Sequence, residues 1–174
     1  MFASHLCLKS LTYNPFLRHL KPGGYIEIQD YDYEVLNGPP DNLRELLPDS
    51  PFLHWTTLTT GAAEKAGRPF VHGKTHGKRL RDNGFETVTE NWEMCPYTPW
   101  NKDKKLKERG QYILMGTQDA LWSYSMALLT RYQGMEKDEV DKLCKETSRE
   151  LVIGKEQYWQ KAWFIYGRKP LDAK

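Results

Sequence analysis

One segment near the start of the chain, residues 20–32 with the sequence LKPGGYIEIQDYD, constrains the fold most. Apolar residues at helical spacing precede Pro22, which cannot continue a helix because its nitrogen carries no hydrogen and its ring clashes with the turn before it. Gly23 and Gly24 permit a sharp reversal, and residues 25–29 then alternate between polar and apolar side chains as a strand does. A helix, a tight turn and a strand in this order are half of a βαβ crossover, which indicates an α/β fold.

The end of this strand is where the sequence predicts a functional site. In open α/β sheets, ligands bind beyond the carboxyl ends of the strands. Asp30 and Asp32 are therefore candidate catalytic bases, and Gln29 and Tyr31 are candidate substrate contacts. A plainer alternative for Asp30 is that its carboxylate only caps a turn after the strand.

The same segment resembles the fifth strand, and the turn before it, of class I S-adenosylmethionine-dependent methyltransferases, in particular the fungal LaeA-like group linked to secondary metabolism. Further segments resemble that group in the same order along the chain. They are EKAGRPF (64–70), NGF (83–85), PW (99–100), KLKE (105–108), LLTR (128–131) and YGRKP (166–170). The resemblance covers nearly the whole chain.

The resemblance implies a partial Rossmann-like methyltransferase sheet, the back half, whose last strand inserts antiparallel between the fifth and sixth. It implies one methyltransferase-like domain over residues 1–174, with a helical lid inserted at residues 97–154. The implied activity is methyl transfer from the cofactor S-adenosylmethionine to a small molecule. Such transfer depends mainly on in-line positioning, with a base where the nucleophile is weak, so no short catalytic signature is expected.

The family's cofactor-binding front half, a strand with a Gly-rich loop and a second strand ending in an acid, is not found before Leu20. The chain therefore resembles the C-terminal half, as a natural truncation or an incomplete gene model. By resemblance, residues 2–9 lie at the exit of the fourth strand, which makes Ser4 and His5 candidate cofactor contacts. Relatives often carry Arg close to the position of Ser4. His5 is also a candidate base, or a histidine on a packed segment.

Loss of the front half would leave a strand edge and an apolar face uncovered. We therefore expect a homo-oligomer, or a protein partner that supplies the front half or a regulatory function. Two other functions stay open besides methyl transfer. One is a cofactor-independent cyclase, pericyclase or isomerase that reuses the methyltransferase pocket, and the other is a non-catalytic regulatory subunit.

Helical periodicity predicts three longer helices, over residues 52–66, 111–133 and 136–151. Trp55 and Trp122 lie in the first two and are candidate substrate-binding aromatics, because small-molecule pockets are mostly apolar. Packing in the core is the alternative for both. Shorter elements are a helix over 78–83 and strands over 85–94 and 158–166.

Two histidines four residues apart, His72 and His76, could share a helix face and bind a metal, or meet a phosphate near a helix start. Gly73 and Gly77 weaken that helical face, and no third ligand is apparent, so a polar loop leading into the helix at 78–83 is the alternative. His76 is a further, weaker candidate base. The three cysteines lie far apart without a C-x-x-C spacing, and no metal site is predicted.

Charge excludes several classes of partner. The chain has 25 Lys and Arg against 23 Asp and Glu, a formal net charge of +2, which is too balanced to indicate nucleic acid or an acidic membrane surface. Residues 1–11 lack a basic leader and a cleavage pattern, and no apolar run reaches the length of a membrane span. We expect a soluble intracellular protein, cytoplasmic or nuclear. Motifs of serine hydrolases, zinc proteases and P-loop nucleotidases are missing.

Overall fold

The computed structural model describes residues 14–70 and 72–172, which divide into two compact units. We call residues 14–32, 72–93 and 161–172 the sheet unit, and residues 33–70 and 94–160 the helical unit. Two long strands, β3 (Glu86–Pro96) and β4 (Tyr158–Arg168), have residues in both units. Each unit is described separately below.

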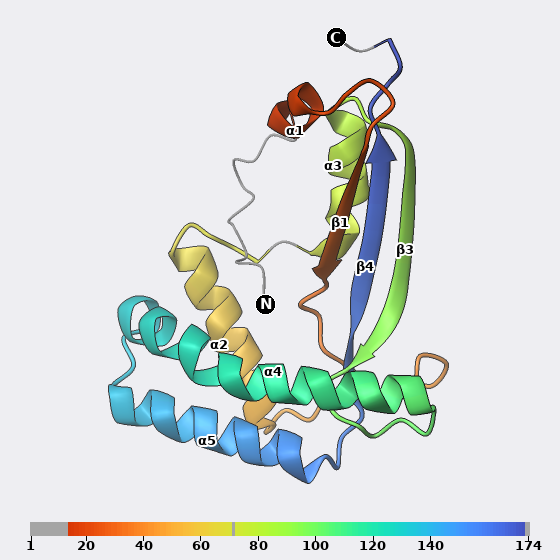
Figure 1. Ribbon diagram of the computed structural model, residues 1–174. Coiled ribbons are helices and arrows are strands. Elements are labelled where there is room, and N and C mark those ends of the chain that lie inside the picture. Colours follow the sequence, from red (N-terminus) through yellow and green to blue (C-terminus); the bar gives the residue numbers. More distant parts are fainter. Residues whose placement is uncertain (1–13, 71, 173–174) are drawn as a thin grey trace. The chain divides into compact units, whose positions relative to one another are not determined.

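The sheet unit is built on β4. This strand pairs antiparallel with β1 (Tyr25–Tyr31), in a register that runs from Tyr25 opposite Arg168 to Tyr31 opposite Ala162. β3 also pairs with β4, which therefore lies between β1 and β3, and both neighbours run in the opposite direction to it (Figure 1). The predicted insertion of the last strand, antiparallel between two others, is confirmed. Among the described residues, β1 pairs along one edge only.

Two short helices complete the sheet unit, α1 (Asn14–His19) and α3 (His76–Asp82), and the 3-10 turn Gly73–Thr75 leads into α3. As predicted, a turn separates α1 from β1. Gly23 in this turn has a φ of +77°, which residues other than glycine rarely adopt. Ile26 and Ile28 of β1 pack against an apolar cluster whose buried members are Leu80, Phe85 and Ile165.

The last strand is longer than its aromatic run suggested, because it continues through Gly167 to Arg168. A Cβ on Gly167 would lie 3.2 Å from the Cβ of Phe85 and 3.3 Å from a methyl group of Val88. This glycine therefore does not end the strand but lets other side chains pack closely against it.

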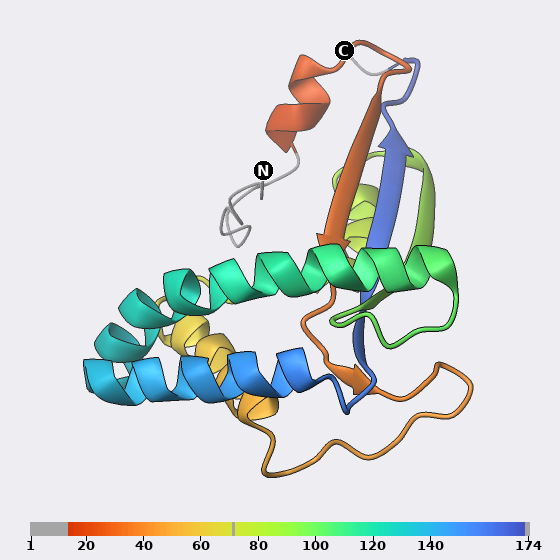
Figure 2. The same ribbon diagram turned by 60° about the horizontal axis from the view of Figure 1, so that its bottom comes forward.

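The helical unit contains three long helices. They are α2 (Pro51–Lys65), α4 (Lys104–Leu128) and α5 (Lys137–Ile153), together with a π-helical turn at Leu129–Gln133 and the short strand β2 (Leu36–Asn37). β2 pairs antiparallel with Tyr158 and Trp159 of β4. Figure 2 shows α4 and α5 from a second direction. The Ser50 hydroxyl caps α2 by accepting a hydrogen bond from the Leu53 amide, as its position before Pro51 predicts.

Helix α4 begins earlier than predicted, at Lys104 instead of residue 111. The Asp103 carboxylate caps it by accepting from the Leu106 amide at 3.0 Å. Gly110 weakens the helical signal in the sequence. In the structure, however, this glycine lets the helix approach the backbone of Thr98 at a distance where a Cβ would clash. The close contact with the Thr98 backbone therefore explains why a glycine occupies this position inside the helix.

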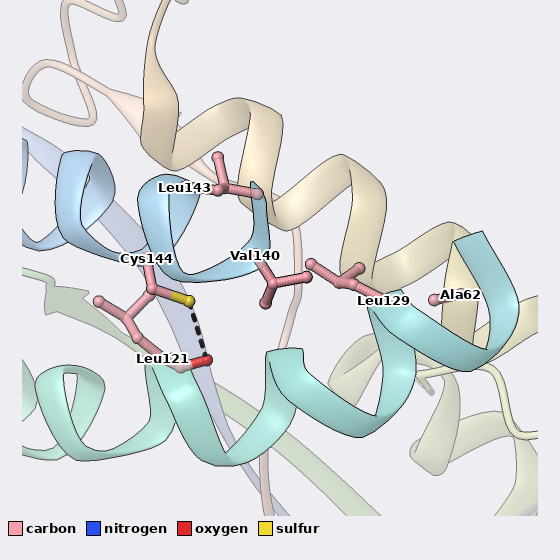
Figure 3. Packing of buried hydrophobic residues seen from close by; sticks show 6 residues of the cluster. All are labelled: Ala62, Leu121, Leu129, Val140, Leu143 and Cys144. Carbon is pink, nitrogen blue, oxygen red and sulfur yellow. Dashed lines mark hydrogen bonds between the residues drawn. The ribbon is translucent and has the colours of Figure 1, made fainter. Parts of the chain in front are cut away.

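Two apolar clusters form the core of the helical unit. Figure 3 shows the first, in which side chains of α2, α4 and α5 meet and the Cys144 thiol donates to the Leu121 carbonyl at 3.6 Å. The second consists of Val35, Phe52, Tyr97, Leu151 and Tyr158. None of the described helices is long and apolar enough to span a membrane. The observed fold is mixed α/β, as predicted.

Candidate functional site

The predicted acidic residues lie at the carboxyl end of β1. Because side chains alternate along a strand, Asp30 points to the opposite face of the sheet from its neighbour Gln29. Asp30 shares a strand face with Ile26 and Ile28, which pack toward α3, because side chains two residues apart point the same way. Gln29 lies on the opposite, exposed face, where its amide donates to Glu27 at 3.0 Å. The predicted set of four adjacent site residues therefore splits between the two faces of the sheet.

Asp30 contacts α3 directly. Its Oδ2 lies 2.8 Å from Nε2 of His76, and its Oδ1 accepts the amide of Tyr31 at 2.8 Å. When Asp30 is ionised its carboxylate can only accept, and His76 Nε2 is then the donor of this contact. The His76 side chain is fully buried, whereas that of Asp30 is 17% exposed. Asp30 is therefore the member of the pair that a ligand can reach.

Asp32 makes a second set of contacts two residues further along. Its carboxylate accepts the indole N–H of Trp163 at 2.9 Å and the amide of Lys74 at 3.4 Å, and Nδ1 of His72 lies 3.7 Å from it. The Asp32 side chain is only 3% exposed, whereas that of His72 is 46% exposed. Asp32 thus ties residues 72–74 to the end of β1.

Two glycines allow close packing around residues 72–77. A Cβ on Gly73 would lie 2.5 Å from Cδ1 of Trp163, and a Cβ on Gly77 would overlap the Glu90 carboxylate. His76 is the first residue of α3 and is buried, so the expectation of a polar loop up to residue 78 is wrong. The expectation of one helix face for both histidines is also wrong, because His72 precedes the 3-10 turn.

No group of three or more His, Cys, Asp or Glu side chains that could hold a metal ion occurs within residues 14–70 and 72–172. The two histidines each face a different aspartate instead, so the described contacts are carboxylate–imidazole pairs. Ser4 and His5, the predicted cofactor contacts, lie outside the described residues.

Comparison with known proteins bears on the family. No family model matches the chain. The chain is 30% identical to tdiE, a probable methyltransferase of Emericella nidulans, over 87% of its own length and 46% of that protein. It is 26% identical to the secondary metabolism regulator laeA of Monascus pilosus, over 92% of this chain and 42% of that protein. It is 28% identical to the protein-methionine methyltransferase laeA of Chaetomium globosum, over 80% of this chain and 43% of that protein.

The chain resembles the LaeA-like methyltransferases. It spans less than half the length of these three relatives. Among solved structures, it aligns with an N-methyltransferase of Haemonchus contortus in complex with phosphomonomethylethanolamine and S-adenosylhomocysteine. That alignment has 16% identity, a TM-score of 0.41, and covers 95% of this chain and 31% of the other.

The two candidate tryptophans of this LaeA-like chain contact the apolar core of the helical unit. The indole of Trp55 donates to the Ser125 hydroxyl at 2.6 Å, and the indole of Trp122 donates to Asp141 at 3.0 Å. Both rings pack against the cluster of Figure 3 and are partly buried. These contacts match the alternative of core packing, and a role in substrate binding stays a prediction.

Sequence reasoning missed Trp163 as a residue of the LaeA-like chain's site. The register of β1 and β4 places Trp163 directly opposite Asp30, from where its indole reaches Asp32. The only signal was its position in an aromatic-rich final strand. Because pairing between strands 130 residues apart depends on the whole fold, the sequence alone did not connect these residues.

The arrangement supports simple acid–base chemistry at one group. A carboxylate held by two donors keeps a fixed orientation, and each of its oxygens retains a lone pair for one further hydrogen bond. Asp30 can therefore accept a proton or a hydrogen bond from a small ligand at the strand end. His76 acts only through Asp30, because its own side chain is not accessible.

Proposed function

We propose that this chain takes part in S-adenosylmethionine-dependent methyl transfer to a small molecule of secondary metabolism, with Asp30 as the proton acceptor. The observation that carries the proposal is the partly exposed Asp30 carboxylate held by buried His76 at the carboxyl end of β1. The similarity to fungal methyltransferases and to a regulator of secondary metabolism supports the reaction class.

S-adenosylmethionine supplies a methyl group that is already activated as a sulfonium. Of the two carboxylates at the end of β1, the partly exposed Asp30 could face such a cation, whereas Asp32 is buried and already accepts from Trp163 and Lys74. Ser4 and His5, the cofactor contacts that the resemblance implies, lie outside the described residues. The chain spans less than half of its relatives' length, so we infer that other residues complete that site.

The chain's own residues contribute proton transfer and orientation. When the methyl carbon–sulfur bond breaks, the methyl group would pass to an oxygen or nitrogen of the substrate and a neutral thioether would leave. Asp30 would accept the proton that the substrate atom loses, so charge and atoms balance. The Tyr31 amide and His76 Nε2 each donate to one carboxylate oxygen, which fixes the direction in which Asp30 accepts. General-base groups of this kind typically contribute about 10²–10⁴-fold to a rate.

The test uses the protein that contains this chain together with the residues that complete the cofactor site, and it measures transfer of labelled methyl from S-adenosylmethionine to a panel of phenols, indoles and amines. We expect Asp30→Asn to lower the rate by about 10²-fold or more, because the amide cannot accept the proton. Glu27→Gln is the matched control, since Glu27 lies on the opposite, exposed face of the same strand. Equal rates for both variants, or no transfer to any small molecule, would contradict the proposal.

A second candidate is a regulatory role exerted through protein contacts, which the name of one relative favours. The two candidates differ in their dependence on Asp30. A regulatory role without chemistry predicts that a strain carrying Asp30→Asn keeps its normal output of secondary metabolites. Turnover with no methyl donor present would instead support a cofactor-independent cyclase or isomerase.

A further inference from the structure

The two carboxylate–imidazole pairs at the end of β1 are arranged in opposite ways. In the first pair, His76 is fully buried and Asp30 is the accessible member. In the second pair, Asp32 is the buried member, at 3% exposed, and the imidazole of His72 is 46% exposed. All four residues belong to the sheet unit. The strand end therefore presents two accessible groups of different chemistry, a carboxylate and an imidazole.

The contacts of Asp32 fix the orientation of its carboxylate. Its amide donates to the Lys161 carbonyl at 2.9 Å, so the pairing with β4 extends to this residue. Its Oδ2 accepts the indole N–H of Trp163 at 2.9 Å, which leaves Oδ1 directed toward Lys74 and His72. A buried carboxylate in a fixed orientation can hold an imidazole in one ring position, as the aspartate of a Ser-His-Asp triad does.

The imidazole of His72 faces this carboxylate with Nδ1, which lies 3.7 Å from Oδ1. Nε2 lies on the far side of the ring, away from Asp32. When Asp32 is ionised and the ring is neutral, the hydrogen on Nδ1 faces the carboxylate, and Nε2 has a lone pair that can accept a hydrogen bond. His72 can therefore act toward a ligand as an acceptor, as Asp30 does.

Trp163 lies between the two accessible groups. It is opposite Asp30 in the strand register, and its indole nitrogen donates to Asp32, two residues further along. Positions two residues apart on a strand are separated by about 7 Å. A hydroxyl has one hydrogen and can donate to only one acceptor, so a ligand that satisfies both accessible groups carries two donor groups.

We propose that His72 is a second acceptor for the substrate, that Asp32 is its positioning residue, and that the site takes small molecules with two hydroxyl or N–H groups. One of these groups, the nucleophile, donates to Asp30. The other donates to His72 Nε2 and is not methylated. This inference rests on the proposed function and deepens it by naming the substrate class.

The first test compares kcat/KM for matched monohydroxy and dihydroxy arenes, in the protein that contains this chain together with the residues that complete the cofactor site. We expect the wild type to prefer the dihydroxy member by about 10-fold, the size of one net hydrogen bond. His72→Phe keeps a ring but has no acceptor, so it should abolish this preference, mainly through a higher KM for the dihydroxy member.

His19→Phe is the matched control for this substitution. His19 is an exposed histidine of the same unit, on α1, which precedes the amino end of β1 (Figure 1). It lies before the strand and not at its carboxyl end, so its loss should leave the preference for the dihydroxy member unchanged. Circular dichroism checks that both variants are folded.

A second test addresses Asp32. Two-bond ¹H–¹⁵N NMR spectra of the same protein with labelled histidine show which ring nitrogen carries the hydrogen. At about pH 9, where an imidazole is ordinarily neutral, we expect the hydrogen of His72 on Nδ1, and His72→Phe identifies the signal. Asp32→Asn should move it to Nε2, because an amide whose oxygen accepts from Trp163 presents its NH₂ group to Nδ1.

The outcomes separate this inference from the proposed function. A preference for the dihydroxy member that survives His72→Phe overturns the role of His72 as acceptor, as does a wild type that uses both members equally. A hydrogen on Nε2 of His72 in the wild type overturns the role of Asp32. In each case methyl transfer that depends on Asp30 leaves the proposed function standing, whereas no transfer to any small molecule overturns both.

Discussion

The two units of the chain are stabilised in different ways. In the helical unit, three helices pack through aliphatic and aromatic side chains, with Leu121, Leu129 and Val140 fully buried in one cluster. In the sheet unit, the described apolar cluster has three buried members, and the contacts at the end of β1 are polar. The predicted site residues Asp30 and Asp32 therefore lie in the unit whose contacts at the strand end are hydrogen bonds to carboxylates and not apolar packing.

The difference has a physical basis. Burial of apolar area stabilises a fold without requiring a particular geometry, whereas a buried carboxylate costs free energy unless donors surround it. The contacts of Asp30 and Asp32 therefore constrain the positions of residues 72–76 more narrowly than aliphatic packing would. Four predictions test this contrast, in order of decreasing expected effect.

Leu121→Ala in the helical unit should cost about 2–5 kcal/mol of unfolding free energy, because it leaves a cavity among fully buried side chains. Urea unfolding gives the loss, and hydrogen exchange by mass spectrometry shows which unit is affected. Met115→Ala on the same helix is the control and should change stability by less than about 0.5 kcal/mol. If Leu121→Ala speeds hydrogen exchange more in β1 than in α5, relative to the wild type, the contrast between the units is wrong.

Asp32→Ala in the sheet unit should cost about 1–3 kcal/mol, because it removes the acceptor of the Trp163 indole. The loss should appear as faster exchange in residues 72–76. Asp82→Ala is the control, because that side chain is 54% exposed and pairs with exposed Lys78. A loss no larger than that of the control would mean that Asp32 does not hold this segment.

Gly73→Ala should cost about 1–3 kcal/mol, because the new methyl group meets the ring of Trp163 and neither side can move freely. Gly77→Ala makes a sharper comparison. Its methyl group meets only the carboxylate end of Glu90, a flexible group, so its cost should be smaller. Thermal unfolding of the two variants checks the order, and a larger loss for Gly77→Ala would contradict the fit around Trp163.

Tyr158→Phe should have the smallest effect at neutral pH, about 0.5–1.5 kcal/mol for the lost hydrogen bond to Glu150. Its effect should depend on pH, because burial, aided by the Glu150 charge, raises the pKa of Tyr158 from 10.0 to about 12. The protonated phenol is required in the folded state, so its stabilisation is complete below pH 10 and is lost as pH rises toward 12. In urea titrations at pH 9 to 12, the unfolding free energy of Tyr158→Phe should therefore fall less with rising pH than that of the wild type.

Much of the local structure could be predicted from the sequence. The turn at Gly23, the cap at Ser50 and the strand that begins at residue 25 follow from rules that act over a few residues. Two element bounds were wrong, because the helix predicted from residue 111 begins at Lys104 and the strand predicted to end at residue 166 continues to Arg168. Gly110 and Gly167 lie inside these elements, where another segment approaches closely. A sequence shows that a side chain is missing but not what occupies the space.

In the candidate site, too, some residues could be predicted from the local sequence and others depend on the tertiary structure. Asp30 and Asp32 were predicted from their place at a strand end, a local property, and the resemblance of residues 20–32 to a methyltransferase segment was local too. Their partners His76 and Trp163 were decided only by the tertiary structure, since α3 and β4 bring them from 46 and 131 residues away. Hydrogen bonds between distant residues depend on strand register and helix position, and these result from the packing of the whole chain.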